Sequence, residues 1–245
     1  MKSKIASIII VLFAAGAVWA ADAASTSQVS DAVAKLKASA NFSWTATTVT
    51  PPDAPFTPPP IKGQKDSGGF AKFSTEFGEN TVEAVLKDGK VAFKGEEGWQ
   101  LAVAGGGFSP DMMALNLAKN GAAGDEAAII LKGVKELKTL EGGAMGGDLS
   151  ADAATDLLTF GPHRTAAKAD PDMPGPKGVK GSARFWVKDG SLVKYQTHLT
   201  GTVTFDGNDA VLDFTRTTAI HDVGTTKMDI PAEAKKKLGA PPAAK

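Results

Sequence analysis

The chain has 245 residues, and its 27 basic and 27 acidic side chains give a formal net charge of zero. This balance disfavours a nucleic-acid partner, since binding to phosphates requires a basic surface. There is no cysteine, which excludes disulfides, thiol chemistry and the lipid-modified cysteine of a bacterial lipoprotein.

The first twenty residues have the layout of a secretory signal peptide: two lysines, an apolar run, and small residues before a cleavage position after Ala20 or Ala23. An uncleaved membrane anchor is disfavoured, because the run is shorter than the roughly 20 residues that span a bilayer. We expect residues 1–20 to be removed and residues 21–245 to form one exported domain, in the periplasm of a bacterium. Loss of the two lysines leaves 25 basic against 27 acidic residues, a net charge of −2.

The mature chain should begin with a helix over residues 25–38, because apolar residues recur there at helical spacing. Residues 41–50 are rich in Thr, Val and aromatics and predict a strand. Proline fills six of the ten positions 51–60. We interpret that segment as an extended loop or strap over the sheet, rather than as a ligand for a proline-recognition domain.

Short strands follow over residues 69–103. A two-residue turn at Asp88-Gly89 would place Leu86 opposite Val91, apolar against apolar.

The middle of the chain, about residues 109–160, is predicted to be a helical insertion. Apolar spacing indicates helices over 109–120, 125–141 and 150–160. The Gly-rich residues 141–147 are expected to be a mobile connector.

A loop over residues 163–180 is expected to lead back to strands, and a short Lys-rich helix begins at Pro231. Strands, then helices, then strands are typical of an α+β fold with an antiparallel sheet.

The best-patterned hairpin surrounds residues 188–190. A three-residue loop there would place Phe185 opposite Val193. A two-residue loop at 189–190 would place Phe185 opposite Lys194 and mix apolar with charged side chains, so we favour the longer loop.

The next hairpin predicts a two-residue loop at Gly207-Asn208, with Tyr195 opposite Ile220. One face of the three strands would then be polar, with Trp186 and Leu192 as exceptions. The other face would be apolar and must be buried, with the mid-chain helices as its cover. It would carry Phe185, Val187, Val193, Tyr195, Leu199, Val203, Phe205, Leu212, Phe214 and Ile220.

Six residues of this apolar face are candidates for lining a ligand site. For each of them the alternative is ordinary core packing. They are Phe185, Tyr195, Leu199, Phe205, Leu212 and Phe214.

Two C-terminal segments, FWVKDGSLVKY at 185–195 and HDVGTTKMDIP at 221–231, resemble the late hairpin and closing strand of the LolA/LppX-like family of exported carriers. The resemblance implies an unclosed antiparallel barrel whose concave, apolar face is covered by helices. It also implies that the protein shelters lipids or the acyl chains of lipidated proteins, with transient membrane contact.

No catalytic, metal or cofactor site is expected. The chain has no nucleophile elbow, phosphate loop or metalloprotease motif. In the predicted register His198 lies opposite Thr217 and His221 opposite Lys194, about 13 Å apart along the strands and too far for one metal. His163 falls in a loop. A hydrolase would require one of the histidines in a cleft beside a carboxylate or serine.

Two functions therefore compete. The first is a soluble exported binding protein that holds an apolar ligand, a lipid or acyl chain, between sheet and helices. The alternative is a structural or interaction module of the cell envelope whose core is filled by its own side chains. The pattern does not indicate an oligomeric state.

Overall fold

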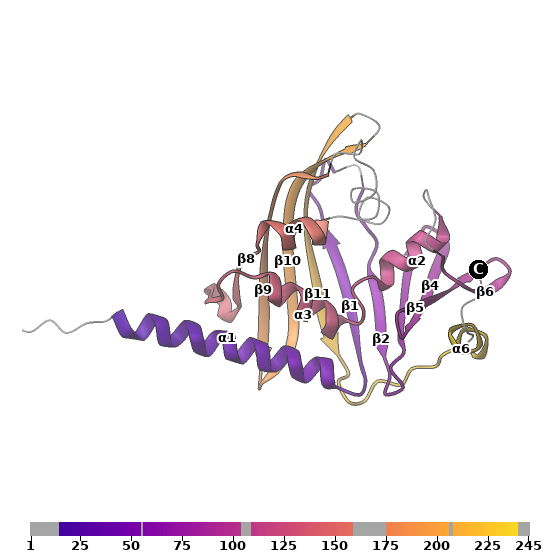
Figure 1. Ribbon diagram of the computed structural model, residues 1–245, viewed down its shortest axis with the longest axis horizontal. Coiled ribbons are helices and arrows are strands. Elements are labelled where there is room, and N and C mark those ends of the chain that lie inside the picture. Colours follow the sequence, from indigo (N-terminus) through magenta and orange to yellow (C-terminus); the bar gives the residue numbers. More distant parts are fainter. Residues whose placement is uncertain (1–14, 55, 104–108, 159–174, 206–207, 240–245) are drawn as a thin grey trace, which may run out of the picture.

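The computed structural model describes residues 15–54, 56–103, 109–158, 175–205 and 208–239. Its centre is one antiparallel sheet of eleven strands in the order β6-β5-β4-β3-β2-β1-β11-β10-β9-β8-β7 (Figure 1). Strands that follow one another in the sequence are neighbours in the sheet, except that β6 and β7 lie at opposite edges. At the middle of the sheet β1 pairs with β11. The sheet therefore has two edges, β6 and β7, and is not closed into a barrel.

The strands are β1 (Phe42–Val49), β2 (Ile61–Lys65), β3 (Ala71–Phe77), β4 (Asn80–Lys87), β5 (Lys90–Gly95), β6 (Gly98–Leu101), β7 (Lys138–Thr139), β8 (Met145–Asp148), β9 (Lys177–Lys188), β10 (Ser191–Phe205) and β11 (Asn208–His221). The helices are α1 (Ala15–Ala38), α2 (Pro110–Ala118), α3 (Ala123–Gly133), α4 (Ala151–Leu158) and α6 (Ala232–Gly239), with a short 3-10 turn at Glu141–Gly143.

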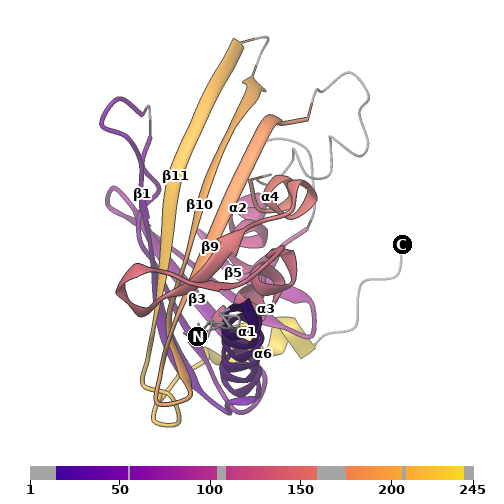
Figure 2. The same cartoon turned by 90° about the vertical axis from the view of Figure 1, so that its left-hand side faces the viewer.

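Four of the helices lie on one face of the sheet, here called the inner face. α1 and α4 pack on β9 and β10, α2 packs on β4 and β5, and α3 packs against α1 and α4. Figure 2 shows α1, α3 and α4 on the same side of β9–β11. The predicted fold class is confirmed: an α+β fold with an unclosed antiparallel sheet and helices over one face.

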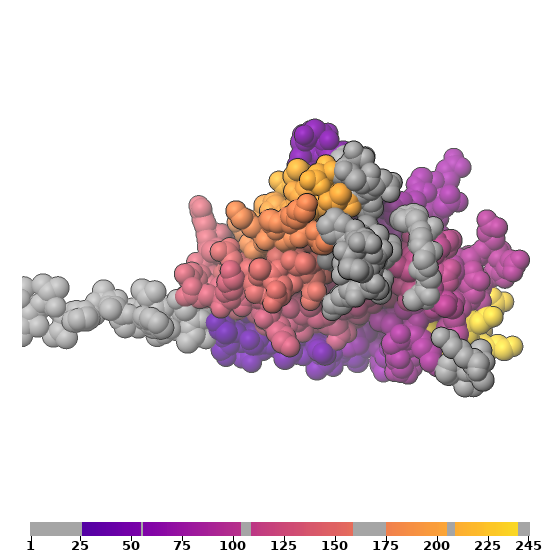
Figure 3. Space-filling view, turned by 45° about the horizontal axis from the view of Figure 1, so that its top comes forward, coloured from indigo at the N-terminus to yellow at the C-terminus, as the bar shows by residue number. Residues whose placement is uncertain are grey.

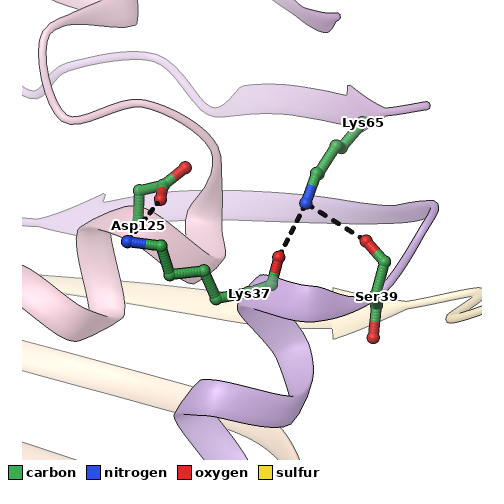
Figure 4. Close-up of polar contacts among 4 residues, drawn as sticks. All are labelled: Lys37, Ser39, Lys65 and Asp125. Carbon is green, nitrogen blue, oxygen red and sulfur yellow. Dashed lines mark hydrogen bonds and ion pairs between the residues drawn. The ribbon is translucent and has the colours of Figure 1, made fainter. Parts of the chain in front are cut away.

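The helix α1 contains the predicted helix at 25–38, and its apolar positions Val29, Val33 and Leu36 are buried. Its C-terminal end is held by two elements (Figure 4). The Lys65 ammonium group donates hydrogen bonds to the carbonyl oxygens of Lys37 and Ser39, which satisfies acceptors that a helix end leaves free. The side chain of Lys37 forms an ion pair with Asp125 of α3, with 3.2 Å between Nζ and Oδ1.

The short helix α6 packs on the other side of the sheet. Successive side chains of a strand point to opposite faces. Ala84 and Phe93 accordingly join the main core, whereas Val85 and Ala92 join a second cluster that contains Ile230, Ala234 and Leu238. The predicted C-terminal helix thus closes the far end of the sheet, beside β5 and β6 (Figure 1).

The predicted turn at Asp88-Gly89 is confirmed. Leu86 pairs with Val91, and both turn residues have positive φ angles, 49° and 76°. This is the backbone geometry that matches the twist of a two-residue hairpin.

The prediction for the end of the helical insertion is wrong in two places. The helix expected over 125–141 ends at Gly133, and the connector expected over 141–147 contains part of the strand β8. The reason is close packing: a methyl group at Gly146 would collide with the carbonyl oxygen of Ala183, and one at Gly147 with that of Glu136. The glycines therefore permit a tight strand pairing rather than a mobile linker.

The predicted three-residue loop at 188–190 is also wrong. Lys188 pairs with Ser191, so the turn has two residues, Asp189 and Gly190. A β-bulge at Val193 then shifts the register by one, which brings Tyr195 opposite Phe185 on the inner face. The bulge also corrects two assignments: Val193 is 37% exposed, and Leu192, expected on the polar face, is buried.

The register of the next hairpin differs from the prediction by two residues. Phe205 pairs with Asn208, and Tyr195 lies opposite Thr218 instead of Ile220. Because a strand has a side-chain period of two, this shift changes the neighbours of each residue but not its face.

The two predicted loops have different outcomes. Residues 51–60 do connect β1 and β2 without regular structure, and the ring of Phe56 stacks on that of Phe77. The loop expected over 163–180 is too long, since β9 begins at Lys177; residues 159–174 lie outside the described part of the chain.

Candidate ligand-binding face

Three of the six candidate lining residues are part of the main core. Phe185, Tyr195 and Leu199 are each at most 2% exposed and lie beneath the helices that cover β9 and β10. The rings of Phe185 and Tyr195 are neighbours, with 6.5 Å between their centroids.

Leu212 and Phe214 are different. Both lie on the inner face of β11 and are only partly buried against the core. The sixth candidate, Phe205, is in β10 opposite Asn208, and its side chain is outside the described part of the structure.

Other apolar side chains packed against the main core are also only partly buried. They include Leu157 of α4, Val179 of β9, and Leu115 and Leu117 of α2. β9–β11 are the longest strands of the sheet, and their ends extend past α4 (Figures 1 and 2). In the space-filling view, orange residues of these strands are visible beside α4 (Figure 3). Partly buried apolar side chains therefore lie on strands that extend beyond α4.

The position of α4 depends on two glycines in the strands beneath it. A methyl group at Gly201 would lie 2.8 Å from Cδ2 of Leu158, and one at Gly181 would lie 3.2 Å from Cβ of Ala154. A side chain at either position would require the α4 residue above it to shift. Ser150 begins the helix by accepting a hydrogen bond from the backbone amide of Ala153, as an N-cap does.

A polar cluster lies between α3 and the sheet, within this apolar layer. Glu126 of α3 is 7% exposed and accepts hydrogen bonds from the Tyr195 hydroxyl, at 2.6 Å, and from the Asn120 amide, at 3.1 Å. Its Oε1 atom is 3.4 Å from Nη2 of Arg216 on β11. The Glu126 cluster, defined by these four residues, therefore joins α3 to two central strands.

The cluster controls the protonation of its members. Burial alone would raise the pKa of Glu126, but the charge of Arg216, the hydrogen bonds from Tyr195 and Asn120, and the charge of Lys119 together hold that pKa below its ordinary value. Burial and the adjacent carboxylate raise the pKa of Tyr195 well above its ordinary value. At neutral pH the pair is therefore a carboxylate that accepts from a neutral phenol.

Sequence reasoning missed Glu126 and Arg216. Glu126 lies outside the apolar spacing from which the helix over 125–141 was predicted. Arg216 could have been found: it has the same strand parity as Leu212, Phe214 and Ile220, so the predicted alternation already places it on the inner face.

The histidines lie elsewhere. His198 pairs with Thr215 and Ser182, not with Thr217, and its Nε2 atom is 2.9 Å from Oδ1 of Asp213. Both side chains of that pair are close to half exposed, on the outer face of the sheet.

Lys194 pairs with Ala219, so His221 does not lie opposite it as predicted. On the other side of β11, His221 pairs with Ser43 of β1. His163 is outside the described residues. Within the described ranges, no group of three or more His, Cys, Asp or Glu side chains is arranged to hold a metal ion. In the same ranges, no helix combines the length and apolarity needed to cross a membrane.

No protein-family model matches the chain, and no curated protein matches its sequence. Among solved structures, the chain is similar to the Mycobacterium tuberculosis lipoprotein LppX, with 11% identity over 85% of this chain and 100% of that one, at a TM-score of 0.45. The chain is also similar to LprF from Mycobacterium bovis, with 11% identity over 86% of this chain and 98% of that one, at a TM-score of 0.44. A third similar structure is a DUF1329 family protein from Desulfovibrio piger, with 8% identity over 84% of this chain and 95% of that one, at a TM-score of 0.29.

Proposed function

We propose that this chain is an exported binding protein that holds an apolar ligand, a lipid or acyl chain, between its sheet and its helices. The supporting observation is that Leu212 and Phe214, on the inner face of β11, are only partly buried against the core, on a strand whose end extends past α4 (Figure 1). Water in contact with such a surface is displaced favourably by an acyl chain, at about 25 cal/mol for each Å² of apolar area covered.

Export and a single mature domain are part of the proposal. The N-terminal residues have the signal-peptide layout described above, and Val29 and Leu36, which α1 contributes to the main core, follow the expected cleavage position. A carrier of this kind would take up its ligand, or a lipidated protein, through transient contact with a membrane.

A second function has its own supporting observation. Phe185, Tyr195 and Leu199 are fully buried by residues of this chain, so much of the sheet–helix interface is ordinary core. If the half-buried residues are covered in the same way in solution, the protein is an envelope module with a filled core.

The test is lipid extraction combined with uptake of a neutral fluorescent probe. The protein is expressed as the full chain, purified, and extracted with organic solvent for mass spectrometry. The delipidated protein is then titrated with N-phenyl-1-naphthylamine, whose fluorescence rises in apolar sites. We expect co-purified lipid and saturable probe binding. The absence of both in repeated preparations overturns the carrier function and favours the filled-core module.

Two adjacent residues of β11 give a matched pair of variants. Leu212 faces inward, whereas Val211 is 76% exposed on the outer face. Leu212→Gln should weaken probe binding, and Val211→Gln, the same change of chemistry one residue away, should not. Equal effects of the two variants would place the bound probe elsewhere.

A further inference from the structure

Arg216 places a guanidinium group on the inner face of β11, in line with the apolar residues of the candidate ligand face. Its neighbours of the same parity are Phe214 and Thr218, and Leu212 follows after Phe214. Alternate residues of a strand are about 6.6 Å apart, so roughly 13 Å of apolar strand face separates Leu212 from Arg216.

The hydrogen-bonding capacity of this guanidinium is incompletely used. A guanidinium has five N–H donors in a planar fork. Nη2 contacts Oε1 of Glu126 at 3.4 Å, and Nε is buried with no hydrogen-bond partner among the described residues. A buried donor without a partner is uncommon and costly, which calls for a missing acceptor.

The side chain of Arg216 is more accessible than that of its carboxylate partner: Arg216 is 30% exposed and Glu126 is 9% exposed. Both oxygens of the carboxylate already accept hydrogen bonds, Oε2 from Tyr195 and Oε1 from Asn120. An incoming anion would therefore meet the exposed part of the Arg216 side chain rather than the oxygens of Glu126.

We infer that Arg216 binds the anionic head group, a carboxylate or phosphate, of an amphiphile whose acyl chain lies along Phe214 and Leu212. Arg is well suited to this contact because its planar fork can bond two oxygens of one oxyanion. The inference rests on the proposed carrier function and adds the chemical class of the ligand to it.

The experiment is displacement of bound N-phenyl-1-naphthylamine from the full-length expression product by three competitors. Dodecanoate carries the chain and the anion, 1-dodecanol carries the chain alone, and acetate carries the anion alone. We expect dodecanoate to compete at least about tenfold better than 1-dodecanol, as a charge-assisted hydrogen bond allows. Acetate should not compete.

Two variants assign the discrimination to Arg216. Arg216→Gln should abolish the preference for dodecanoate over 1-dodecanol. Arg184→Gln makes the same change at an exposed arginine on the outer face of β9 and should retain the preference. If Arg216→Gln fails to fold because Glu126 loses its partner, the paired variant Glu126→Gln/Arg216→Gln removes both charges together and takes its place.

Glu126→Gln alone gives a result that a merely structural role would not. Removing the competing carboxylate should tighten dodecanoate binding and leave 1-dodecanol binding unchanged.

Equal competition by dodecanoate and 1-dodecanol in the unmodified protein overturns the head-group inference and leaves the carrier function standing. Competition by acetate at the same concentrations shows a simple anion site and also overturns it. Failure of the protein to bind the fluorescent probe at all overturns the carrier function itself.

Discussion

The hydroxyl group of Tyr195 donates a 2.6 Å hydrogen bond to Oε2 of Glu126, and both side chains are buried. The two residues are 69 positions apart in the sequence, one on β10 and the other on α3. This bond and the Arg216 ion pair are polar links from α3 to the sheet, so the cluster sets where the helix lies above the inner face.

Tyr195→Phe should lower the free energy of unfolding by about 1.5–3 kcal/mol, the usual range for a hydrogen bond to a charged group. The ring remains in place, so the loss reports the hydroxyl group and not a cavity. Urea unfolding followed by circular dichroism measures the change.

The control is the same substitution in a Glu126→Gln background. The acceptor is then neutral, and the effect of Tyr195→Phe should be clearly smaller. An equal effect in both backgrounds would show that the hydroxyl group acts through another partner.

The lowered pKa of Glu126 predicts a loss of stability in acid. Its folded-state pKa lies below the ordinary value of 4.5, so the unfolded chain binds the proton more readily. The stabilisation is therefore complete above about pH 4.5 and is lost as the pH falls through the folded-state value. Unfolding free energies measured between pH 6 and pH 3 should decline more steeply in the unmodified protein than in Glu126→Gln. Parallel declines would contradict the assignment to this carboxyl group.

Gly147→Ala should destabilise the fold, because the added methyl group collides with the backbone carbonyl of Glu136. A backbone carbonyl cannot rotate away as a side chain does. We therefore expect the free energy of unfolding to fall by about 1–3 kcal/mol or more, the range typical of overpacking. Thermal unfolding measures it.

Gly175→Ala is the matched control for this substitution. Apart from its chain neighbours, no atom of the described residues lies within 4 Å of the position that its methyl group would occupy, so the melting temperature should stay unchanged. Equal stability of the two variants would mean that β8 can separate from its neighbours without cost.

The N-terminus of the exported protein should be Ala21, or Ala24 if the second cleavage position is used. Intact mass measurement of protein from the periplasm of an expressing bacterium determines the position. Cleavage there leaves Val29 and the later buried residues of α1 in place, so the processed protein should unfold cooperatively. A retained N-terminus on protein found in the membrane fraction would contradict the prediction.

Short-range patterns in the sequence were enough to identify most helices and strands and to separate the two faces of β11 and of the part of β10 that follows the bulge. Residues such as Tyr195 and Leu199 face inward whichever of the two registers the hairpin adopts, because the registers differ by two residues and the side-chain period is also two. The turn at Asp88-Gly89 was equally predictable, since two residues of the appropriate type determine it.

The bulge at Val193, the strand β8 and the Glu126 cluster depend instead on contacts between distant segments. The bulge aligns Tyr195 with Phe185 beneath the helices, and β8 forms because its glycines allow close approach to β9. Glu126 is buried only because α3 lies over the sheet, where Tyr195 and Arg216 stabilise its charge. The alternation of residues thus decides which face a side chain occupies, whereas the packing of α3 on the sheet decides that a carboxylate and a guanidinium meet within an apolar layer.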